Sequence, residues 1–427
     1  MSPASRTLLW RLHGLAALLA LPFLLIATVT GLIYLPTPQI EAWQGRSLLQ
    51  VAAGPVLNLD LLVARAQAAA PEGLRLRHVS PPARAGESLR LQFGPAPRAG
   101  HEGHADHGDA SAEPVDVFVD PGSGAVLGQQ RESERYGSWA KQLHSRLQLG
   151  EGLRWMIEWA ATCLLVMLLT GLLLAWPRAG ESLSPRQQPA GRLRWRAWHR
   201  LLGLLLAGLS LVIVLTGLTW SQSAGSQVRA ARDWAQQGAP RAPAGLRSTP
   251  KPGAAPLGFE AIWRHATALA PGVRLQLTPP SRSDGVWRVQ TVDRHLPGRR
   301  AELLLDAYSG APLWQSRWAD LPAFAQATAV GIPFHRGEFG LWNQALLLAF
   351  GLGLLASTAT GVLMALARWR RGQALLPLLR SRTGLRWRWP LLAVSLLLCG
   401  LIPLLAAFLL IVIAVEWRAA RAPMPAV

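Results

Sequence analysis

The chain has 427 residues, of which 50% are hydrophobic and 16% are charged, so a disordered or fibrous protein is excluded and two or three domains are expected. The hydrophobic residues are concentrated in five blocks with almost no charge, at 8–35, 153–176, 199–221, 341–367 and 390–415. Each block reaches or exceeds the roughly 20 residues that a helix needs to cross a hydrocarbon core of ~30 Å. The sequence therefore predicts an α-helical integral membrane protein with about five spanning helices, and the lipid bilayer as a partner.

The first block and the cysteines set two further limits. Block 8–35 is too long for the apolar region of a signal peptide, and no small-residue cleavage site follows it, so we expect a retained helix. Cys163 and Cys399 lie in different apolar blocks, which excludes a disulfide framework and a thiolate metal site in water.

The net charge of +19 would suggest nucleic-acid binding if it lay on one soluble surface, but its distribution excludes this. Arg6 and Arg11 contribute +2, segment 177–200 contributes +5 and segment 368–388 contributes +7, which together account for +14. These short segments alternate with two large ones, as the loops on one side of a membrane do. The positive-inside rule predicts a cytoplasmic N-terminus and cytoplasmic basic loops at 177–198 and 368–388.

The two large segments, 36–150 and 222–338, should lie on the other side of the membrane as folded modules. Each contains a helix-like stretch that ends in Ala-Pro, followed by alternating strand-like runs at 89–93 or 286–290 and a Ser-Gly turn. We therefore expect two small α+β modules. The first carries an insertion at 99–113, and the second begins with a Pro/Gly/Ala-rich stretch, 224–258, that is typical of a flexible linker.

Histidines and Thr-Gly pairs recur at fixed offsets, which indicates two copies of a helix–module–helix unit. His13 and His199 are each followed 17 residues later by Thr-Gly, at an offset of 186 between copies. His144 and His335 precede the Thr-Gly pairs of the second and fourth helices, at offsets of 191 and 190. The repeated residues are His13, Thr30, Gly31, His144, Thr170 and Gly171 in the first copy, and His199, Thr216, Gly217, His335, Thr360 and Gly361 in the second.

The four repeated histidines are the candidate binding residues. Ionisable groups in or beside membrane helices are costly to bury and are functional by default. Two pairs at two depths suggest two bis-histidine sites, and a haem is the cofactor that needs two axial ligands from facing helices and a large apolar slot. Gly31 and Gly217 lie five helical turns from His13 and His199, on the same face, and would meet whatever occupies the outer half of the bundle.

A second interpretation stays open at this point. A histidine at a helix end is often an interfacial residue bonded to lipid phosphate or backbone, and a duplication copies incidental residues as well. Thr-Gly pairs are also typical of close helix packing in membranes.

Missing motifs limit the cofactors. Without a C-x-x-C-H motif, a haem would be a non-covalent b-type haem. There is no G-x-G-x-x-G after a strand, and Lys141 and Lys251 do not form a Walker motif, so we expect no nucleotide cofactor and a separate electron donor.

The insertion at 99–113 contains His101, His104 and His107 with interleaved acids. Histidines at spacing three can bind a transition metal weakly, whereas a Gly-rich polar insertion is usually a solvated loop. Both interpretations stay open.

The helix termini resemble those of the PepSY-associated transmembrane family over nearly the whole chain up to about Arg371. The resemblance rests on segments 10–13 and 30–34, 198–203 and 216–220, 143–147 and 176–178, and 331–340. The family includes iron-regulated inner-membrane proteins and di-haem ferric-siderophore reductases. It implies PepSY-like modules in the periplasm of a multi-pass protein of the bacterial inner membrane.

The resemblance also implies roles for the histidines. His13 and His199 would ligate a cytoplasm-facing haem, and His144 and His335 a periplasm-facing one. An unidentified donor would supply electrons that reduce a ferric siderophore or another ferric chelate at the modules. Two alternatives stay open: a haem-free PepSY protein that binds or regulates a periplasmic peptidase or sensor, and a metal-handling protein centred on the histidine-rich insertion.

Overall fold

A computed structural model describes residues 3–95, 113–177, 183–250, 253–293, 295–374 and 396–421. The chain forms two compact units. The membrane unit comprises Met1–Leu35, Ala140–Gln236 and Gly331–Val427, and the sheet unit comprises Pro36–Trp139 and Gln237–Val330. The divisions fall inside the predicted module ranges 36–150 and 222–338, so that His144 and His335 belong to the membrane unit.

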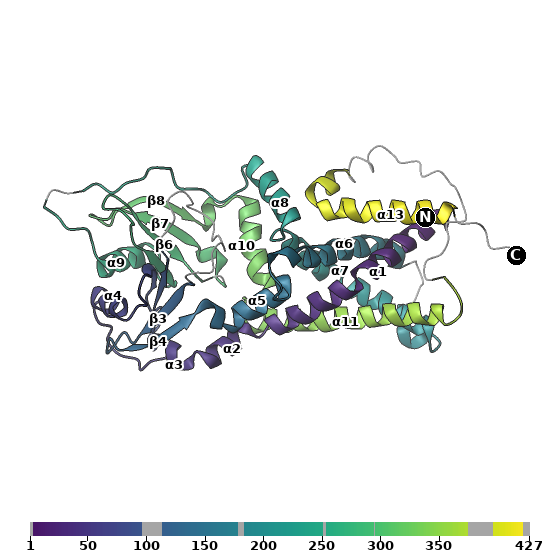
Figure 1. Ribbon diagram of the computed structural model, residues 1–427, viewed down its shortest axis with the longest axis horizontal. Helices are drawn as coiled ribbons and strands as arrows, with labels where there is room; N and C mark the ends of the chain where they lie inside the picture. The colour runs from purple at the N-terminus through teal and green to yellow at the C-terminus, as the bar shows by residue number, and fades with distance from the viewer. Residues whose placement is uncertain are drawn as a thin grey trace. The chain divides into compact units, whose positions relative to one another are not determined.

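Four helices of the membrane unit are long and apolar enough to cross a bilayer, among the residues that the structure describes. They are α1 (Pro3–Tyr34), α6 (Trp155–Ala175), α7 (Arg192–Leu218) and α11 (Leu341–Trp369). Helix α1 packs along α6, α7 packs along α11, and α6 and α7 join the two helix pairs (Figure 1). Their uniform hydrophobicity fits helices that are surrounded by lipid on one side and by other helices on the other.

Three shorter helices of this part of the chain adjoin the long ones. Helices α5 (Tyr136–Arg146) and α10 (Ala323–His335) precede α6 and α11, and α8 (Ser223–Trp234) follows α7. The predicted flexible linker, 224–258, thus begins with a helix. Its N-terminus is fixed by the buried carboxylate of Glu158, which accepts hydrogen bonds from the backbone amides of Ser223 and Ala224.

The predicted fifth span, 390–415, begins outside the described residues. From Pro403 onward the chain forms α13 (Pro403–Arg421), whose apolar part, Pro403–Val415, is shorter than the four long helices. Helix α13 packs against α6 and α8, and the Phe408 side chain is fully buried there. Much of the predicted basic loop 368–388 and part of the loop 177–198 also lie outside the described residues.

The sheet unit contains one antiparallel sheet of eight strands in the order β4-β3-β2-β1-β5-β6-β7-β8. The first module supplies β1 (Arg75–Ser80), β2 (Leu89–Gly94), β3 (Val115–Val119) and β4 (Val126–Arg131), and the second supplies β5 (Leu275–Thr278), β6 (Trp287–Thr291), β7 (Ala301–Leu305) and β8 (Pro312–Arg317). The two modules join edge to edge where Val79 pairs with Leu277. The sequence predicted two modules but not this continuous sheet, which removes one exposed edge from each module.

Helices α4 (Leu59–Ala68) and α9 (Phe259–Leu269) lie against each other on one face of the sheet (Figure 1). Alternate residues of the strands point toward these helices, and Val79, Leu91, Leu277 and Val289 are fully buried there. The core is therefore shared by both modules. Two short helices, α2 (Thr37–Gln44) and α3 (Arg46–Leu49), lead into the first module.

The predicted Ser-Gly turns close the β3–β4 and β7–β8 hairpins in the same way. Asp120 accepts hydrogen bonds from the Gly122 amide and the Ser123 hydroxyl, which lower the pKa of its carboxyl group. Gly124 and Gly310 follow with φ of 70° and 69°, in the left-handed region that favours glycine. The predicted turn chemistry is thus present in both copies.

Candidate functional site

His13 and His199 occupy equivalent places in the two copies, on α1 and α7. The Nδ1 atom of His13 lies 3.1 Å from the carbonyl oxygen of Met167 and 3.2 Å from Oγ1 of Thr170, both on α6. The Nδ1 atom of His199 lies 2.9 Å from the carbonyl oxygen of Ser357, on α11. Oγ1 of Thr360 is the next acceptor, at 3.4 Å. We call His13 and His199 the first pair.

His144 and His335, which we call the second pair, lie on the short helices α5 and α10. The Nδ1 atom of His144 lies 2.9 Å from Oγ1 of Thr30, on α1. The Nδ1 atom of His335 lies 2.9 Å from Oγ1 of Thr216, on α7. Each of the four histidines is therefore held by the threonine of a repeated Thr-Gly pair in its own copy.

The glycine of each Thr-Gly pair makes room for an imidazole ring. A Cβ atom at Gly171 would lie 3.1 Å from Cε1 of His13, and one at Gly361 would lie 3.4 Å from Cε1 of His199. The corresponding distances to the second pair are 3.3 Å at Gly217 and 3.5 Å at Gly31. The small residues thus allow each ring to rest directly on the backbone of a neighbouring helix.

The threonine hydroxyls fix which nitrogen of each ring carries the proton. Each hydroxyl donates its hydrogen to a carbonyl of its own helix, for example to Ile26 from Thr30 at 2.7 Å and to Val212 from Thr216 at 2.7 Å. The same holds for Thr170 and Thr360. A hydroxyl has one hydrogen, so it can only accept from the histidine, and a carbonyl can only accept as well. In the neutral rings Nδ1 is therefore the protonated nitrogen. The lone pair of Nε2 is then available to bind a metal ion.

The first pair is close enough to act on one partner. The ring centroids of His13 and His199 are 6.1 Å apart, and the ring planes are nearly perpendicular, at 86°. In the second pair, the two rings are near enough that a positive charge on His144 would lower the pKa of His335. Both pairs therefore combine one residue from each copy of the repeat.

The two pairs lie at different depths of the helix bundle. Seventeen residues separate His13 from Thr30 on α1, and seventeen separate His199 from Thr216 on α7. At 1.5 Å per residue this corresponds to about 25 Å along the helix axes. A hydrocarbon core of about 30 Å would thus contain one pair near each of its faces.

The second pair is neutral at physiological pH. Burial lowers the pKa of His144 to about 4. Burial, and then the charges of His144 and Arg336, lower the pKa of His335 to about 4. Neutral imidazole is the form that binds a metal ion, so the protonation state and the open Nε2 atom are both those of a ligand.

Arginines accompany the histidines along the chain. Arg200 follows His199, and its Nε donates to the carbonyl of Ala175 at the end of α6, at 2.8 Å. Arg336 follows His335, and two of its nitrogens donate to Oη of Tyr34 at 3.0 and 2.8 Å. Arg11, two residues before His13, is 5% exposed. Arg336 also forms an ion pair with Glu338, at 3.0 Å. Arginines thus lie next to both pairs, and a guanidinium group favours an anionic neighbour.

The sequence singled out the four histidines and two of the glycines, and the structure places each in a repeated contact. Gly31 and Gly217 were predicted to face the contents of the outer half of the bundle, and they lie against the rings of His144 and His335. For the four threonines and for Gly171 and Gly361, sequence reasoning offered only a role in helix packing and no contact with the histidines. The signal was present, because these residues recur at the same offsets as the histidines.

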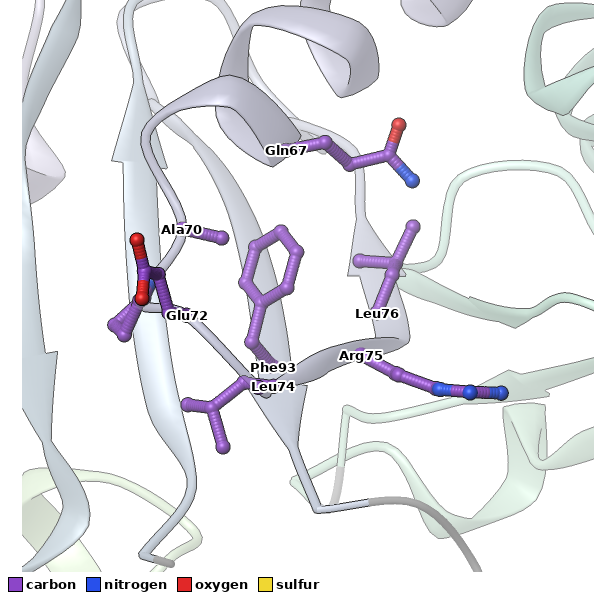
Figure 2. A pocket seen from close by; sticks show the side chains of 9 residues that line it. Gln67, Ala70, Glu72, Leu74, Arg75, Leu76 and Phe93 are labelled. Carbon is purple, nitrogen blue, oxygen red and sulfur yellow. The ribbon is translucent and has the colours of Figure 1, made fainter.

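Two further candidate sites, the histidine-rich insertion and a pocket in the sheet unit, add no residue to the histidine pairs. His101, His104 and His107 lie outside the described residues, and within the described residues no group of three or more metal-binding side chains occurs. A pocket of about 410 Å³ lies at the end of α4 in the sheet unit. Figure 2 shows Phe93 at its centre, with Ala70 and Leu76 on either side. None of the repeated histidines lines it.

The helices define a polytopic membrane protein that is built from two copies of one unit, with the four repeated histidines among its helices. The model of the PepSY-associated TM region matches residues 10–368, which include all four histidines and both modules. The chain therefore belongs to the PepSY-associated TM family. None of the curated proteins compared with the chain matches it.

Proposed function

We propose that the protein is a di-haem b electron-transfer protein of the inner membrane that reduces a periplasmic ferric chelate, as a ferric-siderophore reductase does. The observation that carries the proposal is the state of the four histidines. Every one is held through Nδ1 by a protein acceptor, which leaves Nε2 free. Metal-ligating histidines are held in this way by a partner on the other nitrogen.

The first pair fits a bis-histidine haem in its dimensions. Metal–imidazole bonds of about 2.0 Å, with about 1.1 Å from nitrogen to ring centre, put the centroids of two opposed ligands about 6.2 Å apart. The observed separation of His13 and His199 is 6.1 Å. Rings in an edge-to-face packing contact also lie about 4.5–7 Å apart, so the spacing supports the proposal together with the open Nε2 atoms and not alone.

The His13/His199 and His144/His335 pairs would each hold a haem, which would supply one-electron redox chemistry when bound. The residues of this chain hold and orient the ligands. Thr30 and Thr216 fix the tautomer and the ring orientation of the second pair. Buried apolar residues such as Ala16, Ala20 and Leu24 line the interior between the helices and exclude water from it. Arg200 would contribute positive charge toward the haem carboxylates, as would Arg336, which also pairs with Glu338 at 3.0 Å.

The orientation follows from the charge distribution, with the first pair toward the cytoplasm and the sheet unit in the periplasm. Impermeant thiol reagents applied to intact spheroplasts test this directly. We expect a cysteine introduced by Gly54→Cys in the first module to be labelled, and one introduced by Arg196→Cys at the start of α7 to be protected. The native Cys163 is buried and should stay silent. The opposite labelling pattern would reverse the proposed orientation.

The function is tested by a reduced-minus-oxidised absorption spectrum of the detergent-purified chain, with haem counted per polypeptide. We expect two haems in the native protein and one in each of the variants His13→Ala and His335→Ala. His265→Ala, on α9 of the sheet unit, is the control and should keep two. Protein without haem, made in cells with ample haem supply, would reject the proposal.

The same measurement decides for or against a haem-free PepSY protein that binds or regulates a periplasmic peptidase or sensor. That candidate is supported by one observation, since Nδ1 bonds to threonine would also serve as simple packing locks between helices. It predicts a native protein without haem absorption and no spectroscopic difference between it and the His13→Ala and His335→Ala variants. Metal handling by the insertion is tested by deleting residues 99–113, which should abolish metal binding and leave haem unchanged if that hypothesis is right.

A further inference from the structure

The two histidine pairs differ in the acceptor that lies nearest to Nδ1. In the first pair it is a backbone carbonyl, that of Met167 for His13 at 3.1 Å and that of Ser357 for His199 at 2.9 Å. The threonine oxygens are farther away, at 3.2 and 3.4 Å.

In the second pair the order is inverted. The threonine hydroxyls are nearest, with both Nδ1–Oγ1 distances at 2.9 Å. The carbonyls of Ala27 and Ile213, which correspond to those of Met167 and Ser357, also act on these two rings, but the Nδ1 hydrogen bonds of the second pair go to the threonines. This inversion is the same in both copies of the repeat, so it distinguishes the two sites and not the two copies.

The nature of the acceptor affects the ligand. A carbonyl oxygen carries more negative charge than a hydroxyl oxygen and polarises Nδ1–H more strongly, which makes the imidazole a more basic ligand. A more basic ligand stabilises ferric over ferrous iron and lowers the reduction potential. Arginines flank both pairs along the chain, at Arg11 and Arg200 and at Arg146 and Arg336. Beside the second pair these arginines are ion-paired, Arg336 with Glu338 at 3.0 Å and Arg146 with Glu151. The threonine variants below therefore isolate the effect of the acceptor from that of charge.

We propose that the Nδ1 acceptors set a redox order, in which the centre held by His13 and His199 has the lower reduction potential and passes electrons to the centre held by His144 and His335. This inference rests on the proposed di-haem function. In the step, one electron leaves ferrous iron at the first pair, which becomes ferric, and reduces ferric iron at the second pair to ferrous. No bond breaks and no proton moves. With the first pair toward the cytoplasm, the order makes electron flow outward.

The order is measured by equilibrium redox titration of the purified full chain, followed by the absorption of reduced haem. The double variant His13→Ala/His199→Ala isolates the second centre, and His144→Ala/His335→Ala isolates the first. We expect the equilibrium constant for reduction to be at least tenfold larger at the second centre than at the first. For one electron, this factor corresponds to a reduction potential that is higher by about 59 mV. Equal potentials, or the reverse order, would overturn the inference.

The role of the hydroxyl is tested at Thr30, with a matched control on the same helix. Thr30→Val removes the nearest acceptor of His144, and we expect the second centre to shift severalfold further toward the ferrous form, with the first centre unchanged. Thr30→Ser keeps a hydroxyl and should restore the native value. Thr28→Val is the control, because Thr28 donates to the carbonyl of Leu24 and contacts no histidine. An unchanged or lowered potential in Thr30→Val would show that the hydroxyl does not set the order.

These outcomes separate the two proposals. A chain that binds no haem rejects the di-haem function and this inference with it. A chain with two haems of equal or reversed potential keeps the function and rejects only the redox order.

Discussion

The Nδ1 atom of His144 lies 2.9 Å from Oγ1 of Thr30, although 114 residues separate them in the chain. The contact of His335 with Thr216 repeats it at the same distance. Each histidine is thus oriented by its own copy of the repeat, whereas each pair is completed by the other copy. One copy alone would hold two oriented imidazoles and no paired site, which explains why the duplication is needed for the arrangement.

The glycines that receive the rings offer a graded test. Gly171→Ala would place a Cβ atom 3.1 Å from Cε1 of His13, which is tighter than ordinary contact, so the ring must move by a few tenths of an ångström. Gly31→Ala would place it 3.5 Å from Cε1 of His144, which is ordinary van der Waals contact. We expect Gly171→Ala to weaken haem retention at the first pair by about tenfold, as loss of ligand support does.

Haem transfer from the purified variants to apomyoglobin measures this retention, because the rate reports dissociation. Gly31→Ala should release haem at nearly the native rate. Equal rates in the two variants would mean that the glycines serve helix packing and not the histidine rings.

The repeat made much of this site predictable. The sequence showed the four histidines, the two Thr-Gly positions on each copy and the apolar blocks, because equal offsets can be counted without coordinates. The sequence could not show that the imidazole of His13 contacts Thr170. The hydrophobic pattern of α1 is satisfied whichever apolar helix packs beside it. Threonines also pack commonly between membrane helices, so nothing in the sequence assigned them the additional role of accepting a hydrogen bond from histidine.

The sheet unit was predictable in its parts and not in its assembly. The alternating runs gave β2 and β6, and the Ser-Gly turns gave two hairpins. The pairing of Val79 with Leu277 joins segments that are about 200 residues apart, and no local pattern specifies such a partner. The helix α8 was missed because its composition is typical of a linker, and its stabilising contact comes from Glu158, distant in sequence.

An ion pair that recurs in both modules allows a matched comparison. Asp116 on β3 is 4% exposed and binds Arg90 at 2.8 Å as well as Arg135. Its counterpart Glu302 on β7 binds Arg288, whose side chain is 54% exposed, at 3.1 Å. We expect Asp116→Asn to lower the free energy of unfolding by about 3 kcal/mol, because two cations would then lose their buried partner.

Glu302→Gln should lower the free energy of unfolding by less than about 1 kcal/mol, as exposed pairs do. Chemical denaturation of the full chain in detergent provides both values. Comparable losses in the two variants would show that the additional arginine and the burial of Asp116 do not matter.

The seam between the modules should make stability depend on pH through His78. This residue donates or accepts a hydrogen bond at Oγ1 of Thr278, 2.9 Å away across the seam. Burial lowers its pKa below the ordinary value of 6.5, and the charges of Arg77, Arg90 and Arg288 lower the pKa further, against a smaller opposing effect of Asp116. The unfolded chain therefore binds this proton at a higher pH than the folded protein does, and folding is opposed once the unfolded residue is protonated.

The free energy of unfolding should accordingly fall as the pH decreases through about 6.5, and the fall should end below the folded pKa of His78. His78→Gln keeps a polar group for Thr278 and removes the titration. We expect denaturation curves recorded between pH 8 and pH 5 to show a smaller pH dependence in this variant. A variant whose stability falls as steeply as that of the native chain would place the effect on another group.

The buried carboxylate of Glu158 should be a stabilising residue of the membrane unit. It is 2% exposed in the first turn of α6 and accepts hydrogen bonds from the Ser223 amide at 3.0 Å, from the Ala224 amide at 2.8 Å and from the Ser223 hydroxyl. These donors open α8, where a helix terminus leaves its amides unsatisfied and carries a partial positive charge. Removing the carboxylate would leave buried donors without their acceptor.

We expect Glu158→Ala to lower the free energy of unfolding by about 3 kcal/mol, since each buried donor left unsatisfied costs about 1–3 kcal/mol. Glu158→Gln keeps one acceptor oxygen and should lose less. Glu151→Ala is the control, because Glu151 is 53% exposed and its ion pairs with arginine should contribute little. Equal losses of unfolding free energy in Glu158→Ala and Glu151→Ala would mean that α8 is held by its packing against α13 and not by the Glu158 carboxylate. Hydrogen exchange of the Ser223 and Ala224 amides would then show that α8 persists in the Glu158→Ala variant.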